Sequence, residues 1–187
     1  IIITGEKKNE ALKVIKEVAY KMNCKFIQSK PTNLETNLIG PFQKYNAGIA
    51  VLAARELGVN EENIKNGLKK VNWPGRLEYL DRNLLVDCAH NLEGLIALRK
   101  YVNKKNYKLI IIFGSSKKKD TQEMIKNLPK YKKLIFTMSK SVKALDPESV
   151  AFDSISNSIK IKDFVEAFNY SKSLQKNGEI ILITGSI

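Results

Sequence analysis

The chain has 187 residues, of which 43% are hydrophobic and 27% charged, and this is the composition of a globular protein rather than a disordered one. Its apolar runs, such as Leu109–Phe113, are too short to cross a membrane, and no signal peptide is visible. One histidine and two distant cysteines cannot form a cysteine–histidine zinc site. We expect Cys24 and Cys88 to be buried thiols of a protein in the reducing cytoplasm.

The net charge of +13 makes nucleic acid a partner to consider. Only Arg55, Arg76, Arg82 and Arg99 are arginines, and the other basic residues are lysines in scattered runs. Direct readout of bases favours arginine, and single-strand binding uses aromatic residues interleaved with the charge. Neither pattern is present, so we expect a solvated, lysine-rich surface and no sequence-specific binding of nucleic acid.

In the first part of the chain, short apolar runs alternate with helical patterns. The opening IIIT predicts a strand, and apolar residues at helical spacing predict a helix from about Asn9 to Met22. A short strand is predicted at Cys24–Gln28, followed by a polar loop. Two further helices are predicted over Phe42–Leu57, with Gly58 as the terminating glycine, and over Glu61–Val71.

The Trp73-Pro74-Gly75 break is the strongest candidate for a domain boundary, and it separates residues 1–74 from residues 75–187. Beyond it the predicted elements, in chain order, are a strand at 83–89, a helix at 92–102, a strand at 108–116, a helix from Asp120, a strand at 132–139, a helix near Pro147–Phe152, and a strand at 179–186. Residues 158–161 form either a strand or the approach to a helix that carries Phe164 and Phe168.

The strands of this second part are continuous apolar runs, which is typical of strands buried on both faces. Strands that alternate with helices indicate parallel pairing through helical crossovers. The sequence therefore predicts an α/β fold with a mostly parallel sheet and helices on both faces.

Polar side chains follow the first strand of the second part, at the position where parallel α/β sheets bind ligands. Asp87 could accept ribose hydroxyls, and His90 could donate to a carboxylate or phosphoryl oxygen. Asn91 suits the N-cap of the following helix. The structural alternative makes Asp87 a turn residue and His90 an ordinary surface histidine.

Three further residues could contact a nucleotide. Arg76 follows the Pro-Gly break and has the planar donor set that suits phosphate, although a surface ion pair with Glu78 is the alternative. Gln43 and Asn46 share one face at the start of a helix and could contact the edge of a purine. The polarity that is usual at a helix start explains this pair equally well.

Several segments, in this order and spacing, resemble folylpolyglutamate synthase/dihydrofolate synthase of the Mur ligase superfamily. They are GPFQKYNAGIAVLAARELG, IKNGL, WPGRLE, VDCAHN, FGSSKKKD, SVKA and LITGS. The resemblance covers nearly the whole chain. It implies that residues 1–74 are the C-terminal part of a central ATP-binding domain. Residues 75–187 would then form a C-terminal Rossmann-like glutamate-ligase domain, joined to the first by a hinge at Pro74-Gly75.

Enzymes of this family phosphorylate the carboxylate of folate or dihydropteroate with ATP, and the amine of L-glutamate then attacks the acyl phosphate. The resemblance places Gln43 and Asn46 against adenine. It places Arg76 at the phosphates, and Asp87 either at the ribose or where it would help position the nucleotide. It also places His90 at the incoming glutamate or the reacting phosphoryl group, and Asn91 at the glutamate. We accordingly expect a cytoplasmic, monomeric enzyme of folate biosynthesis and one-carbon metabolism that uses ATP and Mg²⁺.

No G-x-x-x-x-G-K-[ST] motif occurs in the chain. We therefore expect the phosphate loop and the metal ligands upstream of Ile1, and a C-terminal fragment that is inactive alone. Other Mur ligases usually carry a lysine where His90 stands, which favours folate as the substrate. Another Mur-type amino-acid ligase, or a non-catalytic Rossmann-like binding module with a basic surface, remains the alternative. The segment does not distinguish addition of the first glutamate from chain extension.

Overall fold

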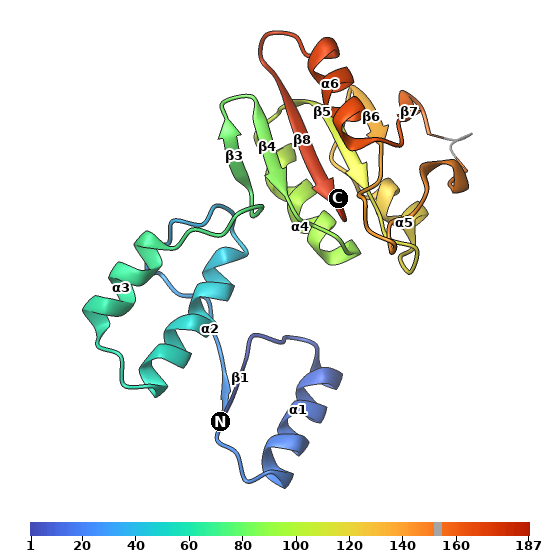
Figure 1. Cartoon of the computed structure of the whole chain (residues 1–187). Helices are drawn as coiled ribbons and strands as arrows, with labels where there is room; N and C mark the ends of the chain where they lie inside the picture. Colours follow the sequence, from blue (N-terminus) through green and yellow to red (C-terminus); the bar gives the residue numbers. More distant parts are fainter. Residues whose placement is uncertain (152–154) are drawn as a thin grey trace. The chain divides into compact units, whose positions relative to one another are not determined.

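The computed structural model describes residues 1–151 and 155–187. The chain divides into two units, Ile1–Trp73 and Pro74–Ile187 (Figure 1). The division lies inside the Trp-Pro-Gly break. Of the helices in the described ranges, none is both long and apolar enough to span a bilayer.

The first unit contains a two-stranded parallel sheet and three helices. Its elements are β1 (Ile2–Thr4), α1 (Asn9–Lys21), β2 (Phe26–Gln28), α2 (Gln43–Glu56) and α3 (Glu61–Lys70). Ile2 lies opposite Phe26, and α1 is the crossover between the two strands. Gly58 adopts a φ of +77° just after Leu57, the C-cap of α2, so the predicted glycine termination is confirmed. Asn60 caps α3 by accepting the N–H of Asn63 at 2.8 Å.

The second unit is built on one six-stranded sheet with the strand order β3-β4-β8-β5-β6-β7. The strands are β3 (Glu78–Asp81), β4 (Leu84–Asp87), β5 (Lys108–Gly114), β6 (Lys133–Phe136), β7 (Ser158–Lys160) and β8 (Glu179–Gly185). Only β3 runs antiparallel to its neighbour, and the pairs from β4 to β7 are parallel. The predicted mostly parallel sheet is thereby confirmed.

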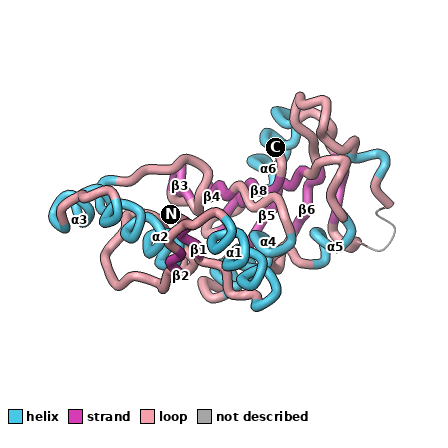
Figure 2. The backbone as a smooth tube through the Cα atoms, turned by 90° about the horizontal axis from the view of Figure 1, so that it is seen from below, coloured by secondary structure: helices cyan, strands magenta, loops and turns pink. Residues whose placement is uncertain are grey.

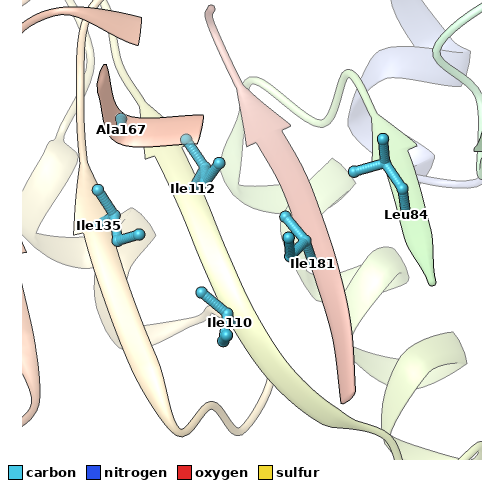
Figure 3. Packing of buried hydrophobic residues seen from close by; sticks show 6 residues of the cluster. All are labelled: Leu84, Ile110, Ile112, Ile135, Ala167 and Ile181. Atoms are coloured by element: carbon cyan, nitrogen blue, oxygen red, sulfur yellow. The ribbon is translucent and has the colours of Figure 1, made fainter. Parts of the chain in front are cut away.

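Helices cover both faces of this sheet. They are α4 (Leu92–Asn103), α5 (Thr121–Lys126) and α6 (Phe164–Leu174). Figure 2 shows α4 and α5 on one side of the strands and α6 on the other. On the α6 side, buried aliphatic residues from four strands meet Ala167 (Figure 3); these are Leu84, Ile110, Ile112, Ile135 and Ile181. Alternate residues of the same strands, such as Leu109 and Ile111, are also fully buried, which explains the continuous apolar runs.

Three details of the second unit differ from, or decide between, the predictions. The edge strand β3 was not expected, because its residues are half-exposed or exposed and only the pairing with β4 makes them a strand. The predicted helix near Pro147–Phe152 is a single 3₁₀ turn at Pro147–Ser149 that Asp146 caps, and Phe152 lies outside the described residues. Residues 158–160 form the strand β7 rather than a helical approach.

The cysteines were predicted to be buried, and this prediction is wrong. Both are free thiols; Cys24 is half-buried and Cys88 is exposed. Cys88 lies in the turn that follows β4, where its N–H donates to the carbonyl of Gly75 at 2.8 Å. The backbone of Cys88 is therefore engaged while its side chain points to the surface of the turn.

One ion pair joins the beginnings of two strands of the sheet. The ammonium of Lys132 donates to both oxygens of Glu179, at 2.8 and 3.0 Å, and the N–H of Lys176 donates at 3.0 Å. The Lys132 hydrogen bond, and after it the N–H of Lys176, lower the pKa of this carboxyl below its usual range. A carboxylate with a lowered pKa stabilises the fold at neutral pH, and this stabilisation is lost as the pH falls through the lowered pKa.

We expect Glu179→Gln to lower the free energy of unfolding by about 1 kcal/mol at pH 7, since Lys132 is partly solvated. The difference from wild type should shrink at an acidic pH below the lowered pKa of Glu179, where both proteins carry a neutral side chain. Urea denaturation at the two pH values measures this. Glu166→Gln, at an exposed position on α6, controls for the loss of one charge. A difference that is the same at both pH values would contradict the role of the ion pair.

Candidate functional site

Asp87 is the last residue of β4, beside Thr184 of β8, at the carboxyl edge of the sheet. Its side chain is only 5% exposed. One carboxylate oxygen accepts the N–H of Leu77 and the other the N–H of Ala89, both at 3.0 Å. Burial raises the pKa of Asp87, whereas these two hydrogen bonds and the charge of Arg76 oppose the rise. The carboxylate of Asp87 therefore joins two turns. These contacts are those of a turn residue, the structural alternative considered for Asp87 from the sequence.

His90 and Asn91 follow in the turn between β4 and α4, and both are exposed. The Nδ1 of His90 lies 2.9 Å from the carbonyl oxygen of Cys88. Because a carbonyl only accepts, Nδ1 must carry the proton, and in the neutral ring Nε2 is then an unprotonated acceptor. Asn91 caps α4 by accepting the N–H of Gly94 at 2.8 Å, which confirms the predicted N-cap.

Arg76 lies in the turn that precedes β3, and its side chain is exposed. The alternative ion pair with Glu78 is not formed; the Glu78 carboxylate instead accepts the N–H of Gly75 at 2.7 Å. Within the described part of the chain, the guanidinium makes no hydrogen bond or ion pair. Its fork of donors is thus available to an external anion.

Gln43 and Asn46 form a polar pair at the first turn of α2, in the first unit. The side-chain amide of Asn46 donates to Oε1 of Gln43 at 3.0 Å. Gln43 is 3% exposed, whereas Asn46 is exposed. The pair leaves the Gln43 amide nitrogen as a donor and the Asn46 oxygen as an acceptor, the two functions that an adenine edge requires.

The loop after β5 is tied to the loop that contains Val142 and Ala144. Lys117 donates its N–H to the carbonyl of Lys143 and its ammonium to the carbonyl of Val142, both at 3.0 Å. An isolated antiparallel bridge joins Ser116 to Ala144. The segments FGSSKKKD and SVKA, two separate motifs of the family resemblance, are therefore in contact at the carboxyl edge of the sheet.

A pocket of about 880 Å³ lies where β4 and β8 end and α6 begins. Asp87, Thr184 and Lys140 line it together with apolar side chains. The hydroxyl of Thr184 is buried, with no hydrogen-bond partner among the described residues. The sequence interpretation did not single out Thr184 or Lys140. Both residues lie at or just beyond the end of an apolar run. This position could have marked them as site residues, because parallel sheets bind ligands at the carboxyl ends of their strands.

In the described ranges, no three histidine, cysteine, aspartate or glutamate side chains converge as they would at a metal site. The buried carboxylate of Asp87 already accepts two backbone N–H groups. These residues do not fit a Mg²⁺ site, because Mg²⁺ needs several accessible oxygen ligands in near-octahedral geometry.

The second unit, which contains this site, matches a known domain. A family model described as "Mur ligase, glutamate ligase domain" matches residues 75–187, more than half of the chain. The chain belongs to the Mur ligase family. The resemblance inferred from the ordered motifs is therefore confirmed at the level of the family, and the binding-module alternative is not favoured.

Two curated Mur ligase relatives show how much of such an enzyme this chain represents. The dihydrofolate synthase/folylpolyglutamate synthase of Bacillus subtilis is 30% identical over 190 residues, which cover 95% of this chain and 43% of the relative. A UDP-N-acetylmuramoyl-L-alanyl-D-glutamate–2,6-diaminopimelate ligase of Aquifex aeolicus is 30% identical over 173 residues, or 84% of this chain and 36% of that enzyme. The chain spans less than half the length of these Mur ligases.

Solved structures of folylpolyglutamate synthases share the fold. The folylpolyglutamate synthase of Mycobacterium tuberculosis, in complex with ADP, superposes with a TM-score of 0.86 at 18% identity, over 98% of this chain and 52% of that one. The bifunctional synthase of Yersinia pestis, with AMPPNP and a Mn ion, gives 0.82 at 17% identity, over 98% and 50%. Nucleotide and divalent-metal binding thus occur in structural neighbours of this chain.

Proposed function

We propose that this chain is part of an ATP-dependent ligase that joins L-glutamate to folate or dihydropteroate through an acyl phosphate. The observation that carries the proposal is the pair of turns joined through Asp87, which present a histidine and an arginine, the latter without an ion pair among the described residues, at the carboxyl edge of a Mur ligase domain. The similarity of 95% of the chain to a synthase of this type supports the choice of substrate. The free thiols of Cys24 and Cys88 agree with a cytoplasmic location, and we propose a monomer.

Two chemical steps make up the proposed reaction. A carboxylate oxygen of the acceptor attacks the γ-phosphorus of ATP, and the bond to the leaving ADP oxygen breaks. The amine of glutamate then attacks the acyl carbon, and inorganic phosphate leaves as the amide forms. In the first step Arg76 stabilises the negative charge on the transferred phosphoryl group.

His90 acts in the second step. A glutamate amine must lose its extra protons before and during the attack, and the Nε2 of His90 is the free acceptor when Nδ1 is bonded to the Cys88 carbonyl. Asn91 caps α4, whose N-terminal N–H groups favour a carboxylate of the same glutamate. In the other unit, Gln43 and Asn46 contact adenine through the donor and acceptor that their mutual hydrogen bond leaves over.

The magnesium of the proposed reaction belongs to residues other than those described, because these do not fit such a site. No step of the proposal is assigned to a metal held by this chain. The role of Asp87 at a ribose is likewise secondary in this proposal, since the carboxylate is buried and already holds two backbone groups.

A second candidate is a cell-wall ligase, because the diaminopimelate ligase is equally identical over most of the chain. Purified full-length protein should be assayed for ATP-dependent phosphate release with glutamate and either dihydropteroate or a reduced folate. The same assay with UDP-N-acetylmuramoyl-L-alanyl-D-glutamate and diaminopimelate is the control. Activity only in the second assay would transfer the proposal to the cell-wall substrate.

We expect the 187-residue chain alone to bind ATP weakly, because these residues contain no phosphate-loop motif. Phosphoryl transfer depends on that loop, its lysine and a metal ion for positioning and charge neutralisation. The dissociation constant should exceed ~1 mM, a binding free energy of about 4 kcal/mol at most. Isothermal titration with ATP and Mg²⁺, alongside the full-length enzyme, tests this. Turnover by the 187-residue chain would contradict the proposal that phosphoryl transfer needs a phosphate loop outside these residues.

A further inference from the structure

Arg76 lies in a backbone turn whose two adjoining peptide N–H groups are both held by carboxylates. Glu78 accepts the N–H of Gly75 at 2.7 Å, and Asp87 accepts the N–H of Leu77 at 3.0 Å. The carbonyl of Gly75 also accepts the N–H of Cys88 at 2.8 Å. Three hydrogen bonds therefore fix the backbone on both sides of one exposed arginine.

This turn has a conformation that needs such support. Gly75 has a φ of +73° and Leu77 a φ of +49°. The left-handed region costs a non-glycine residue on the order of 1–2 kcal/mol, so Leu77 remains there only because its surroundings hold it. Its side chain is fully buried, and its N–H is bonded to Asp87. The turn is a strained arrangement maintained by these two contacts.

The hydrogen bonds of both carboxylates go to backbone N–H groups, and the Arg76 guanidinium acts on Asp87 only through its charge. A glutamate two residues from an arginine commonly forms an ion pair with it, and such a pair would compete with an incoming anion. Here Glu78 is turned to Gly75, and the Arg76 side chain has no hydrogen-bond or ion-pair partner in the described ranges. The geometry thus orients Arg76 without neutralising its donors.

We propose that Glu78 and Asp87 are positioning residues that hold the Arg76 turn ready for an anionic phosphoryl group. The phosphoryl group comes from the proposed ligase reaction, so the expected effect of Glu78 and Asp87 on catalysis rests on the proposed function. Asp87 also accepts the N–H of Ala89, so changing it disturbs the turn that carries His90 as well. Within the described residues the Glu78 side chain bonds to the Gly75 N–H and to no other group, which makes it the residue for a clean test.

The first measurement is amide hydrogen exchange by NMR in the 187-residue chain, which needs no substrate. Glu78→Ala should speed exchange of the Gly75 N–H by ~10-fold or more, as expected when a hydrogen bond to a charged group is lost. Glu78→Gln keeps an acceptor oxygen and should fall between alanine and wild type. The core amide of Ile111 should exchange at an unchanged rate. Unchanged exchange at Gly75 in Glu78→Ala would overturn the proposal.

The second measurement is a double-mutant cycle in the full-length enzyme. Glu78→Ala should lower kcat by about 10-fold, with little change in the KM for glutamate, and Glu78→Gln should recover part of the loss. In an Arg76→Ala background the same change should have less than about a twofold effect, because coupled residues do not contribute additively. If Glu78→Ala lowered kcat by the same factor with and without Arg76, the proposal that Glu78 acts by positioning Arg76 would be overturned. A wild-type enzyme inactive on every acceptor would refute the proposed function, and the exchange experiment would still decide the role of Glu78.

Discussion

Arg76→Ala in the full-length enzyme is expected to lower turnover by about 100-fold or more. Donors aimed at charge that develops in the transition state contribute about this much when one is removed. The Arg76 guanidinium makes no hydrogen bond or ion pair in the described ranges, and its turn is anchored on both sides, which supports the proposal that it is a preformed anion-binding group. Because the guanidinium makes no hydrogen bond or ion pair in the described ranges and only its charge acts on the buried Asp87 carboxylate, the loss should appear mainly in kcat and only slightly in the stability of the protein.

The matched control is Arg82→Ala, which removes an exposed arginine from the turn between β3 and β4. It should leave turnover within about twofold of wild type, since surface charges remote from a site contribute little. Arg76→Lys keeps the charge but loses the planar fork, and its turnover should lie between those of wild type and alanine. If Arg76→Ala and Arg82→Ala had equal turnover, the assignment of Arg76 would be wrong.

Gly185→Ala should destabilise the second unit by about 3 kcal/mol or more, through backbone strain and displaced packing. Gly185 ends β8 with a φ of +104°, a conformation that L-residues rarely adopt. An added Cβ would lie 2.0 Å from the carbonyl oxygen of Gly114 and 3.0 Å from the ring of Phe113. The end of β5 would have to move away, although the two strands are paired there residue for residue.

Gly178→Ala is the control that separates the backbone strain of a positive φ from the steric overlap of the added Cβ. Gly178 also has a positive φ, of +80°, but an added Cβ would meet no atom within 4 Å. This variant should lose only about 1–2 kcal/mol, the cost of a left-handed residue. Urea denaturation of the 187-residue chain measures both variants. Equal losses would mean that β5 and β8 yield at their carboxyl ends, contrary to their close pairing.

The local elements of this protein were readable from the sequence because their signals are local. Asn91 was predicted to cap a helix at 92–102, and α4 occupies Leu92–Asn103 with Asn91 as its cap. A polar cap followed by apolar residues at helical spacing needs no distant partner to be recognised. The uninterrupted apolar runs likewise indicated strands buried on both faces, and the ordered motifs indicated the family.

Only the tertiary structure decided the partners of the polar groups at the site. Asp87 bonds to Leu77, ten positions earlier, and Glu78 bonds to Gly75 rather than to Arg76. Strand β8, last in the chain, lies between β4 and β5, and β3 is a strand only through its pairing with β4. A carboxylate can accept from any N–H that the fold brings near, and its choice follows from strand order and left-handed turns. These depend on contacts between distant segments, so the sequence determined which elements form, while the packing of the sheet determined which side chains are free to act.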